Sequence, residues 1–306
     1  MSVVILRALG LGDFLTALPA LRALADAFAE HRRLLAMPAA LAPLAPLPRD
    51  VTGARVAVNL HGRGPESHRV LLAMRPKRLI AFHHPAIAET ARSPRWHADE
   101  HDVARWCRLL TEHGIAADPT RLDLVAPGFA PFAVPRVVSG ATILHPGAAS
   151  AARRWPAERW AAVARAESAA GRRVIITGGA AEVELAASIA RAAGLDRDAV
   201  HAGVDVWALA GLVHAAARVV CGDTGVAHLA TALRTRSVVL FGPCSPAQWG
   251  PPPKRPWHRV LWKGRTGDPH ASTLDAGLAA ITVDEVLRAL EDITAVAPWA
   301  YARTRG

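Results

Sequence analysis

Short apolar runs alternate with amphipathic segments along most of the 306-residue chain. The first run, Ser2-Val-Val-Ile-Leu-Arg7, predicts a buried strand, followed by a turn at Gly10-Leu-Gly12 and a helix that begins at Asp13. Apolar residues recur in this helix at spacings of three and four, and Pro19 is expected to bend it. Further strands are predicted at 55–60, 78–82, 141–144, 173–177, 219–221 and 237–241, and further helices at 101–114, 156–170, 181–193, 206–216, 226–233 and 282–296.

Strands that alternate with helices are typical of parallel sheets built from βαβ units. The pattern runs in two blocks, which a Pro- and Gly-rich, uncharged stretch at 127–135 separates. We therefore predict an α/β protein with two Rossmann-like domains whose parallel sheets face a central cleft. Ligands of such folds bind beyond the carboxyl ends of the strands, so we expect the functional residues in the loops that follow strands.

The composition narrows the classes of function. Hydrophobic residues make up 51% of the chain, which excludes a disordered protein, and the net charge is +10. No run of Lys and Arg exceeds two residues, so no nucleic-acid partner is expected; an acidic substrate or an anionic membrane surface fits the charge equally well. Charged residues interrupt the apolar first 29 residues, which argues against a signal peptide or a membrane span. Cys107, Cys221 and Cys244 are too scattered for a disulfide framework, which favours a cytoplasmic protein.

Asp13 is the first candidate for chemistry, because it follows two glycines at the expected start of a helix. As an N-cap, its side chain would accept hydrogen bonds from free backbone N–H groups. As a functional group, a carboxylate at a helix N-terminus stays ionised and can take a proton from a hydroxyl nucleophile. Both roles remain open from the residues alone. The turn does not match GxGxxG, so a nicotinamide site has little support.

Two later loops have the composition of anion sites. The first, His145-Pro-Gly-Ala-Ala-Ser150, offers backbone N–H groups and a hydroxyl, and Arg153-Arg-Trp-Pro156 adds two cations, which together suit a diphosphate. A surface loop with solvated arginines is the alternative. The second, Cys221-Gly-Asp-Thr-Gly225, lies between a strand and a helix that carries His228 in its first turn. Asp223 would be costly in an anion site, so we assign it a capping role first.

A third loop, Gly178-Gly179, precedes Glu182 and Glu184. Acidic residues in a first helical turn complement the helix dipole, and a carboxylate after a glycine turn can also bind the hydroxyl pair of a ribose. Seven histidines lie between residues 61 and 113, but none has the spacing of a metal-ligand motif, so no metal site is expected.

These motifs occur together in one order: GLGD with LPAL, then HPGA and RRWP, then GGAAE, then GDTGVAHLA followed by Phe241-Gly-Pro243. The set resembles glycosyltransferase family 9, the bacterial ADP-heptose heptosyltransferases. The resemblance extends over nearly the whole chain and is strongest from Ala141 to Gly250, and GDTGVAHLA is its most specific element.

The resemblance implies the GT-B fold, with an acceptor-binding domain at 1–133, a donor-binding domain at 134–284 and a C-terminal helical segment at 285–306 that packs back on the first domain. It also implies an inverting, metal-independent transfer of a heptose or related sugar from an ADP-activated donor, without a cofactor. By resemblance, Asp13 is the general base that deprotonates the acceptor hydroxyl. The residues expected on the donor side are Ser150, Arg153 in place of the family's usual Lys, Glu182 at the ribose with Glu184 as the less favoured alternative, Asp223 in its capping role, Thr224 and Gly225 at the diphosphate, and His228 beside it.

The acceptor is not assigned, because the region from Asn59 to His101 does not match the lipopolysaccharide heptosyltransferases closely. Gly12, His61 and Arg63 are the candidates to bind it, and either an anionic glycolipid core or a polar small-molecule natural product fits their chemistry. At most a peripheral membrane contact is expected. Two other functions remain open: a nucleotide-sugar 2-epimerase on the same fold, and a non-catalytic nucleotide- or nucleic-acid-binding module.

Overall fold

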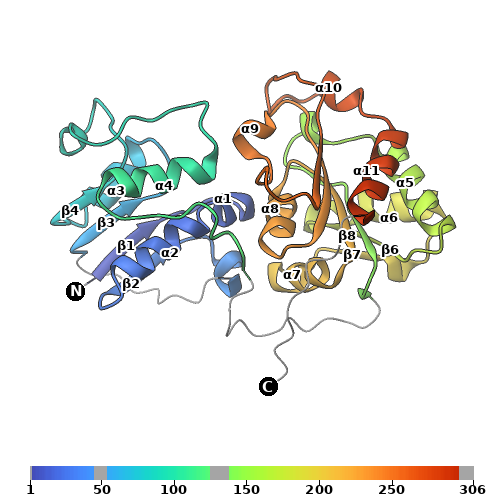
Figure 1. The fold of residues 1–306 in the computed structure, drawn as a ribbon, viewed down its shortest axis with the longest axis horizontal. Helices are drawn as coiled ribbons and strands as arrows, with labels where there is room; N and C mark the ends of the chain where they lie inside the picture. Colours follow the sequence, from blue (N-terminus) through green and yellow to red (C-terminus); the bar gives the residue numbers. More distant parts are fainter. Residues whose placement is uncertain (1, 45–53, 125–137, 296–306) are drawn as a thin grey trace. The chain divides into compact units, whose positions relative to one another are not determined.

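The computed structural model describes residues 2–44, 54–124 and 138–295, which form two compact units (Figure 1). The units comprise Met1–Leu122 and Asp123–Gly306. We predicted the boundary between residues 133 and 134. That position and the expected linker at 127–135 lie outside the described residues. Asp123 belongs to the second unit because its carboxylate pairs there with Arg234 and Arg255.

The first unit is built on a four-stranded parallel sheet in the order β2-β1-β3-β4. Its strands are β1 (Ser2–Leu6), β2 (Arg32–Ala36), β3 (Val56–Asn59) and β4 (Arg78–Ile80). Its helices are α1 (Leu11–Thr16), α2 (Leu18–Ala27), α3 (Glu66–Leu72) and α4 (Asp102–Glu112), with 3₁₀ turns at Ala39–Leu44 and Ala88–Thr90.

Pro19 has a larger effect than the expected bend. The segment after Gly10 forms two helices, because α1 ends at Thr16 and Pro19 occupies the first turn of α2, where its missing N–H costs nothing. The inward face predicted for the helix at 101–114 is confirmed, since Val103, Trp106, Leu109 and Leu110 of α4 are buried.

The second unit contains a six-stranded parallel sheet in the order β10-β9-β8-β5-β6-β7. The strands are β5 (Thr142–His145), β6 (Val174–Gly178), β7 (Val200–Ala202), β8 (Arg218–Gly222), β9 (Arg236–Leu240) and β10 (His258–Leu261). The helices are α5 (Ala157–Ala169), α6 (Val183–Ala193), α7 (Val206–Ala215), α8 (Gly225–Ala232), α9 (Pro246–Trp249), α10 (Ala276–Ala279) and α11 (Val283–Ala295), with 3₁₀ turns at Ala151–Arg153, Ala180–Glu182 and Arg197–Ala199.

The last helix belongs to the core of the second unit. The described part of the segment 285–306 belongs to α11, whose apolar residues Val286, Leu290 and Ile293 are buried in the core of the second unit together with Trp160 of α5. This helix therefore helps to cover the sheet of the second unit, and the packing of the segment 285–306 on the first domain stays a prediction. The remainder of the segment, 296–306, lies outside the described residues.

The strand order determines where a ligand can bind. In the first unit the chain leaves β1 toward β2 on one side, and β3 lies on the other; in the second unit β5 lies between β6 and β8 in the same way. The loops that follow β1 and β3, and those that follow β5 and β8, therefore lie at the switch points of their sheets, where α/β folds bind ligands. The loop after β6 lies beside that of β5 at the same edge of the second sheet. The predicted α/β class with two Rossmann-like domains is confirmed. None of the helices in the described ranges combines the length and the apolar composition needed to cross a bilayer.

Candidate active site

Thr224 is the centre of the candidate donor site in the second unit. It is the N-cap residue of α8, directly after β8, but its side chain makes no capping hydrogen bond. Its Oγ1 is buried and has no hydrogen-bond partner. A buried hydroxyl without a partner is costly, so its presence at a helix N-terminus, where backbone N–H groups are also free, indicates a site for an anionic ligand.

Arg153 joins this site from the neighbouring loop after β5. Its Nη1 donates a hydrogen bond of 3.2 Å to the carbonyl oxygen of Asp223, the residue before Thr224. Its Nε is buried and has no hydrogen-bond partner. The structure thus brings an arginine of the loop after β5 to the GDTG loop, and both Arg153 Nε and Thr224 Oγ1 are left without a hydrogen-bond partner.

Asp223 does not have the capping role that we assigned to it first. The N-cap of α8 is Thr224, and the buried Asp223 carboxylate instead lies 3.9 Å from Nη1 of Arg153. It also accepts a hydrogen bond from the thiol of Cys244, whose pKa rises to about 12 because of burial and the nearby Asp223 charge. A buried carboxylate is tolerated here because an arginine and a thiol compensate it. Cys244 carried no sequence signal for this contact.

Glu182 folds back over the loops after β5 and β6. Its Oε2 accepts a 2.7 Å hydrogen bond from the backbone N–H of Gly179. Its carboxyl group lies against Gly147, where a Cβ atom would come within 2.0–2.2 Å of it. Gly147 thus leaves the space that this carboxylate occupies. Glu184 lies on the surface, where it pairs with Arg191 at 2.6 Å.

His145, at the end of β5, lies under the same loops. Its Nδ1 and Thr177 Oγ1 are hydrogen-bonded at 2.9 Å. Burial lowers the pKa of its imidazole to about 4, and the Glu182 carboxylate opposes this effect. The ring is therefore neutral at pH 7 and serves as a fixed polar support beside Glu182. The sequence placed His145 in a motif but gave it no role.

The other predicted donor residues lie around the same edge of the sheet. Ser150 donates a 2.6 Å hydrogen bond from its Oγ to the carbonyl oxygen of Pro269, so its hydroxyl already holds the loop before α10. Gly225 is the first residue of α8. His228, in the first turn of α8, packs edge-on against Trp249 of α9 with 6.4 Å between the ring centres.

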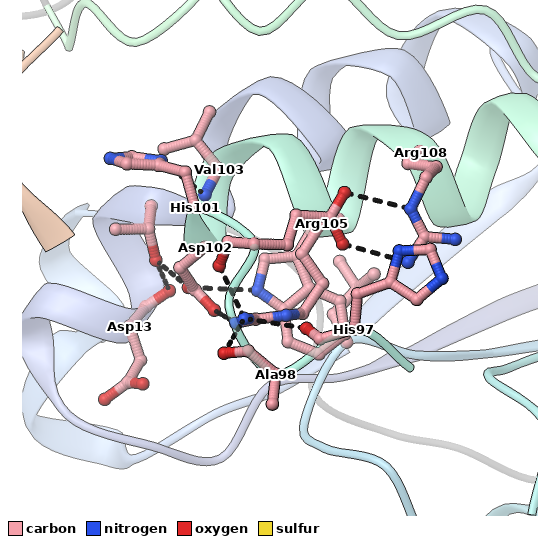
Figure 2. Close-up of polar contacts among 12 residues, drawn as sticks. Asp13, His97, Ala98, His101, Asp102, Val103, Arg105 and Arg108 are labelled. Atoms are coloured by element: carbon pink, nitrogen blue, oxygen red, sulfur yellow. Dashed lines mark hydrogen bonds and ion pairs between the residues drawn. The ribbon is translucent and has the colours of Figure 1, made fainter. Parts of the chain in front are cut away.

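Asp13 lies at the carboxyl end of β1 in the first unit, in the first turn of α1. The N-cap of this helix is Gly10, so Asp13 does not have the N-cap role. Its side chain is 32% exposed, and its Oδ1 lies 3.7 Å from Nη2 of the buried Arg7. Arg7 Nε also donates a 2.8 Å hydrogen bond to the carbonyl oxygen of Asp13, so one guanidinium contacts both the main chain and the side chain of this residue. Figure 2 shows Asp13 beside the start of α4.

His61 faces the same end of the sheet from the loop after β3. Its backbone N–H donates to Asn59 Oδ1 at 2.8 Å, and its Nδ1 is buried without a partner. Burial, and then the charge of Arg7, lower the pKa of the imidazole, while Asp13 opposes them. Of the other acceptor candidates, Gly12 is half-buried within α1 and Arg63 is exposed. His61 and Asp13 thus follow neighbouring strands at the same end of the sheet, and Arg63 is a surface cation of the loop that carries His61.

Side chains that could bind a metal do not cluster in the described part of either unit. Across the described ranges, no group of three or more His, Cys, Asp or Glu side chains is placed to hold a metal ion. His68, one of the histidines of the N-terminal half, is fully buried and hydrogen-bonds through Nε2 to the carbonyl oxygen of Phe82 at 2.8 Å.

Solved structures share this fold over nearly the whole of this chain. The chain is similar to an ADP-heptose lipopolysaccharide heptosyltransferase II from E. coli (20% identity, TM-score 0.75, 96% of this chain and 98% of that one). It is also similar to the E. coli heptosyltransferase WaaC solved with ADP (17%, 0.71, 96% and 100%). A third structure is the iron-containing dodecameric glycosyltransferase TibC from enterotoxigenic E. coli (14%, 0.59, 96% and 78%). These likenesses identify the fold as GT-B. No curated protein sequence matches the chain.

A family model extends the evidence from fold to family. The model of glycosyltransferase family 9 (heptosyltransferase) matches residues 88–269, more than half of the chain. The match contains the loops after β5, β6 and β8, which carry Arg153, Glu182 and Thr224. The chain therefore belongs to glycosyltransferase family 9, the heptosyltransferases.

Proposed function

We propose that the protein transfers a heptose or a related sugar from an ADP-activated donor to an acceptor hydroxyl, with inversion at the anomeric carbon. Membership of the family favours this reaction over the 2-epimerase and the non-catalytic module. The donor is proposed from structural relatives that were solved with ADP and with an ADP-heptose analogue. The observation that carries the proposal is the buried, unpartnered Oγ1 of Thr224 beside the unpartnered Nε of Arg153.

These two groups suit a diphosphate. The free N–H groups of α8 and the Thr224 hydroxyl would donate to phosphate oxygens, and the Arg153 guanidinium would contribute a positive charge. Gly225 would let the main chain approach the diphosphate, with His228 beside it. Glu182 would accept hydrogen bonds from the ribose hydroxyls once its carboxylate turns from Gly179. Ser150 and Asp223 hold the loops of this site through Pro269 and Arg153.

The acceptor would bind at the first unit, where Asp13 is the proposed general base. Its carboxylate takes the proton of the acceptor hydroxyl as the acceptor oxygen bonds to the anomeric carbon of the donor. The bond from that carbon to the diphosphate oxygen breaks in the same step, and ADP leaves with the electron pair. A single displacement of this kind inverts the configuration. Gly12, His61 and Arg63 would bind a polar or anionic acceptor, either a glycolipid core or a small-molecule natural product.

We further propose that the transfer needs neither a metal nor a cofactor. In that reaction, the negative charge that develops on ADP would be stabilised by Arg153, Thr224 and the N-terminus of α8. A cytoplasmic location with at most peripheral membrane contact, and no nucleic-acid partner, completes the proposal.

Thermal unfolding of the purified chain with ADP, UDP, GDP and dTDP at equal concentrations tests the donor. A ligand that binds only the folded state raises the unfolding temperature in proportion to the logarithm of its excess over Kd. We expect ADP to raise it more than the other three. If another diphosphate raised the unfolding temperature more, that nucleotide would take the place of ADP in the proposed donor. If none of the four raised it, the donor site at Thr224 would be contradicted.

A further inference from the structure

Asp102, in the first turn of α4, is a buried carboxylate surrounded by donors. Its Oδ2 accepts hydrogen bonds from Arg7 Nη2 at 3.0 Å, from Thr16 Oγ1 at 2.6 Å and from Trp106 Nε1 at 3.0 Å. Its Oδ1 accepts a 2.7 Å hydrogen bond from Arg105 Nη1. Burial by itself would raise the pKa of Asp102, but Arg7 and the hydrogen bonds from Thr16 and Trp106 lower it below its usual value. The side chain is thus a fixed negative charge.

Arg7 connects this charge to Asp13. The guanidinium is 1% exposed and stacks on Trp106 at 4.7 Å. Its Nη2 lies 3.0 Å from the Asp102 carboxylate and 3.7 Å from the Asp13 carboxylate. A buried guanidinium without a countercharge would be strongly unfavourable, so the two carboxylates share the compensation of Arg7. Thr16 belongs to both sides, because its Oγ1 also lies 3.0 Å from the carbonyl oxygen of Asp13.

Arg105 fixes the other side of Asp102. Its Nη2 donates to the carbonyl oxygens of His97, Ala98 and Glu100, which belong to the loop that leads into α4 (Figure 2). Arg105 also lies over the ring of Trp96 at 4.3 Å. Arg7 and Arg105 together carry two positive charges, and Asp102 compensates one of them. The remaining positive charge lies next to Asp13.

We infer that Asp102 is a positioning residue for Asp13, which it influences through Arg7. Asp102 holds Arg7 at 3.7 Å from the base, close enough to orient its carboxylate but too far for a direct hydrogen bond that would occupy it. The inference rests on the proposed role of Asp13 as the base, and it adds a residue from α4, 89 positions away (102 − 13), to the acceptor half of the site. The groups that face Asp13 are Arg7 at the end of β1 and His61 after β3, with Asp102 and Arg105 of α4 behind Arg7.

Neutralising Asp102 should make Asp13 a weaker base. Without this charge, Arg7 keeps Asp13 as its single carboxylate partner and pairs with it more closely. The proton affinity of Asp13 then falls, because its cationic partner is no longer shared with a second carboxylate. Asp102→Asn should therefore make the base weaker and lower kcat, while the KM for the donor stays unchanged because the donor loops lie in the second unit.

The experiment is a ¹³C NMR titration of the Asp13 carboxyl carbon in the full chain, assigned with Asp13→Asn. We compare the wild-type chain with Asp102→Asn and with Glu167→Gln as a matched control. Glu167 is also a buried carboxylate that accepts from two arginines and a threonine, here Arg218, Arg172 and Thr142, but it belongs to α5 of the second unit and lies at the amino ends of β5 and β8. Each substitution removes the negative charge of a buried carboxylate that two arginines contact. Only Asp102→Asn should move the Asp13 titration to lower pH.

An Asp13 titration that is the same in Asp102→Asn and in the wild-type chain would overturn the inference, as would an equal shift in Glu167→Gln. If Asp102→Asn does not fold, Arg7→Gln decides, because removal of the cation should move the Asp13 titration to higher pH, and an unchanged titration would again overturn the inference. The titration needs neither donor nor acceptor. A failure of the proposed function would appear instead as a wild-type chain that does not transfer sugar from ADP-heptose.

Discussion

Arg153 donates a hydrogen bond from Nη1 to the carbonyl oxygen of Asp223 across 3.2 Å, which links the loop after β5 to the loop after β8. The two loops are 70 residues apart in sequence, but β5 and β8 are neighbours in the sheet. The link places an arginine with an unsatisfied Nε next to a threonine with an unsatisfied Oγ1. Unsatisfied donors from two loops at one sheet edge are the feature on which the donor site depends.

Replacement of Thr224 by Val should weaken ADP binding. A hydrogen bond to a charged group contributes about 1.5–3 kcal/mol, so we expect Kd for ADP to rise roughly 10- to 100-fold. Thr231→Val, in the same helix, is the control, because Thr231 Oγ1 donates to the carbonyl oxygen of Ala227 at 3.0 Å and has no unsatisfied hydrogen bond to offer. Isothermal titration calorimetry with ADP measures both variants. Equal affinities in the two variants would remove Thr224 from the donor site.

A methyl group at Gly147 should also impair ADP binding, through Glu182. A Cβ at this position would come within 2.0–2.2 Å of the Glu182 carboxyl group and would displace it. Gly179→Ala is the control, because a Cβ there lies 3.5 Å from Glu182 Oε2, an ordinary contact. We expect weaker ADP binding in Gly147→Ala alone, again by calorimetry. An unchanged affinity would argue that Glu182 does not bind the ribose in this place.

The stability of the fold should fall as the pH falls from about 6.5 to about 4. Burial lowers the pKa of His145 from its usual 6.5 to about 4, so between these values the unfolded chain binds a proton that the folded chain does not. The stabilisation is complete above pH 6.5 and is lost on acidification. Burial lowers the pKa of His258 further, to about 3, in the same direction.

Denaturant midpoints measured from pH 4 to pH 7.5 test this prediction. His145→Asn keeps a polar group near Thr177 but does not titrate, so its midpoint should depend less on pH than that of the wild-type chain. His201→Asn, at a half-buried position of β7, should retain the wild-type slope. Identical slopes in all three chains would contradict the neutral, buried state of His145.

The apolar periodicity of the chain predicted the strands at the switch points and most of the helices that follow them. It did not identify β2, β7 and β10, which are edge strands of their sheets. Edge strands are half-solvated, so their patterns are weak: β2 begins with Arg32 and Arg33, and β7 has three residues of intermediate exposure. The helix α3 was also missed, because its buried residues are only His68 and Leu71.

The candidate site shows the same limit. Thr224, Arg153 and Asp13 could be chosen in advance because each follows a strand in a recognisable motif. The contacts that define their surroundings could not, since they join residues far apart in the chain: Asp223 with Cys244, Glu182 with Gly147, and Asp102 with Arg7 across 95 residues. Such pairs depend on the strand order, which local patterns do not specify.

The most direct test of the account is a transfer assay with ADP-heptose and a set of polar and anionic acceptors, with the wild-type chain, Asp13→Asn and Asp26→Asn. Asp26 is an exposed carboxylate of α2 that pairs with Arg121, and it serves as the matched control. We expect a glycosidic product with inverted anomeric configuration and a loss of about 10²- to 10⁴-fold in kcat for Asp13→Asn, the usual contribution of a general base. Asp26→Asn should match the wild-type chain, and ADP should still stabilise Asp13→Asn. A product with retained configuration, or full activity in Asp13→Asn, would contradict the account.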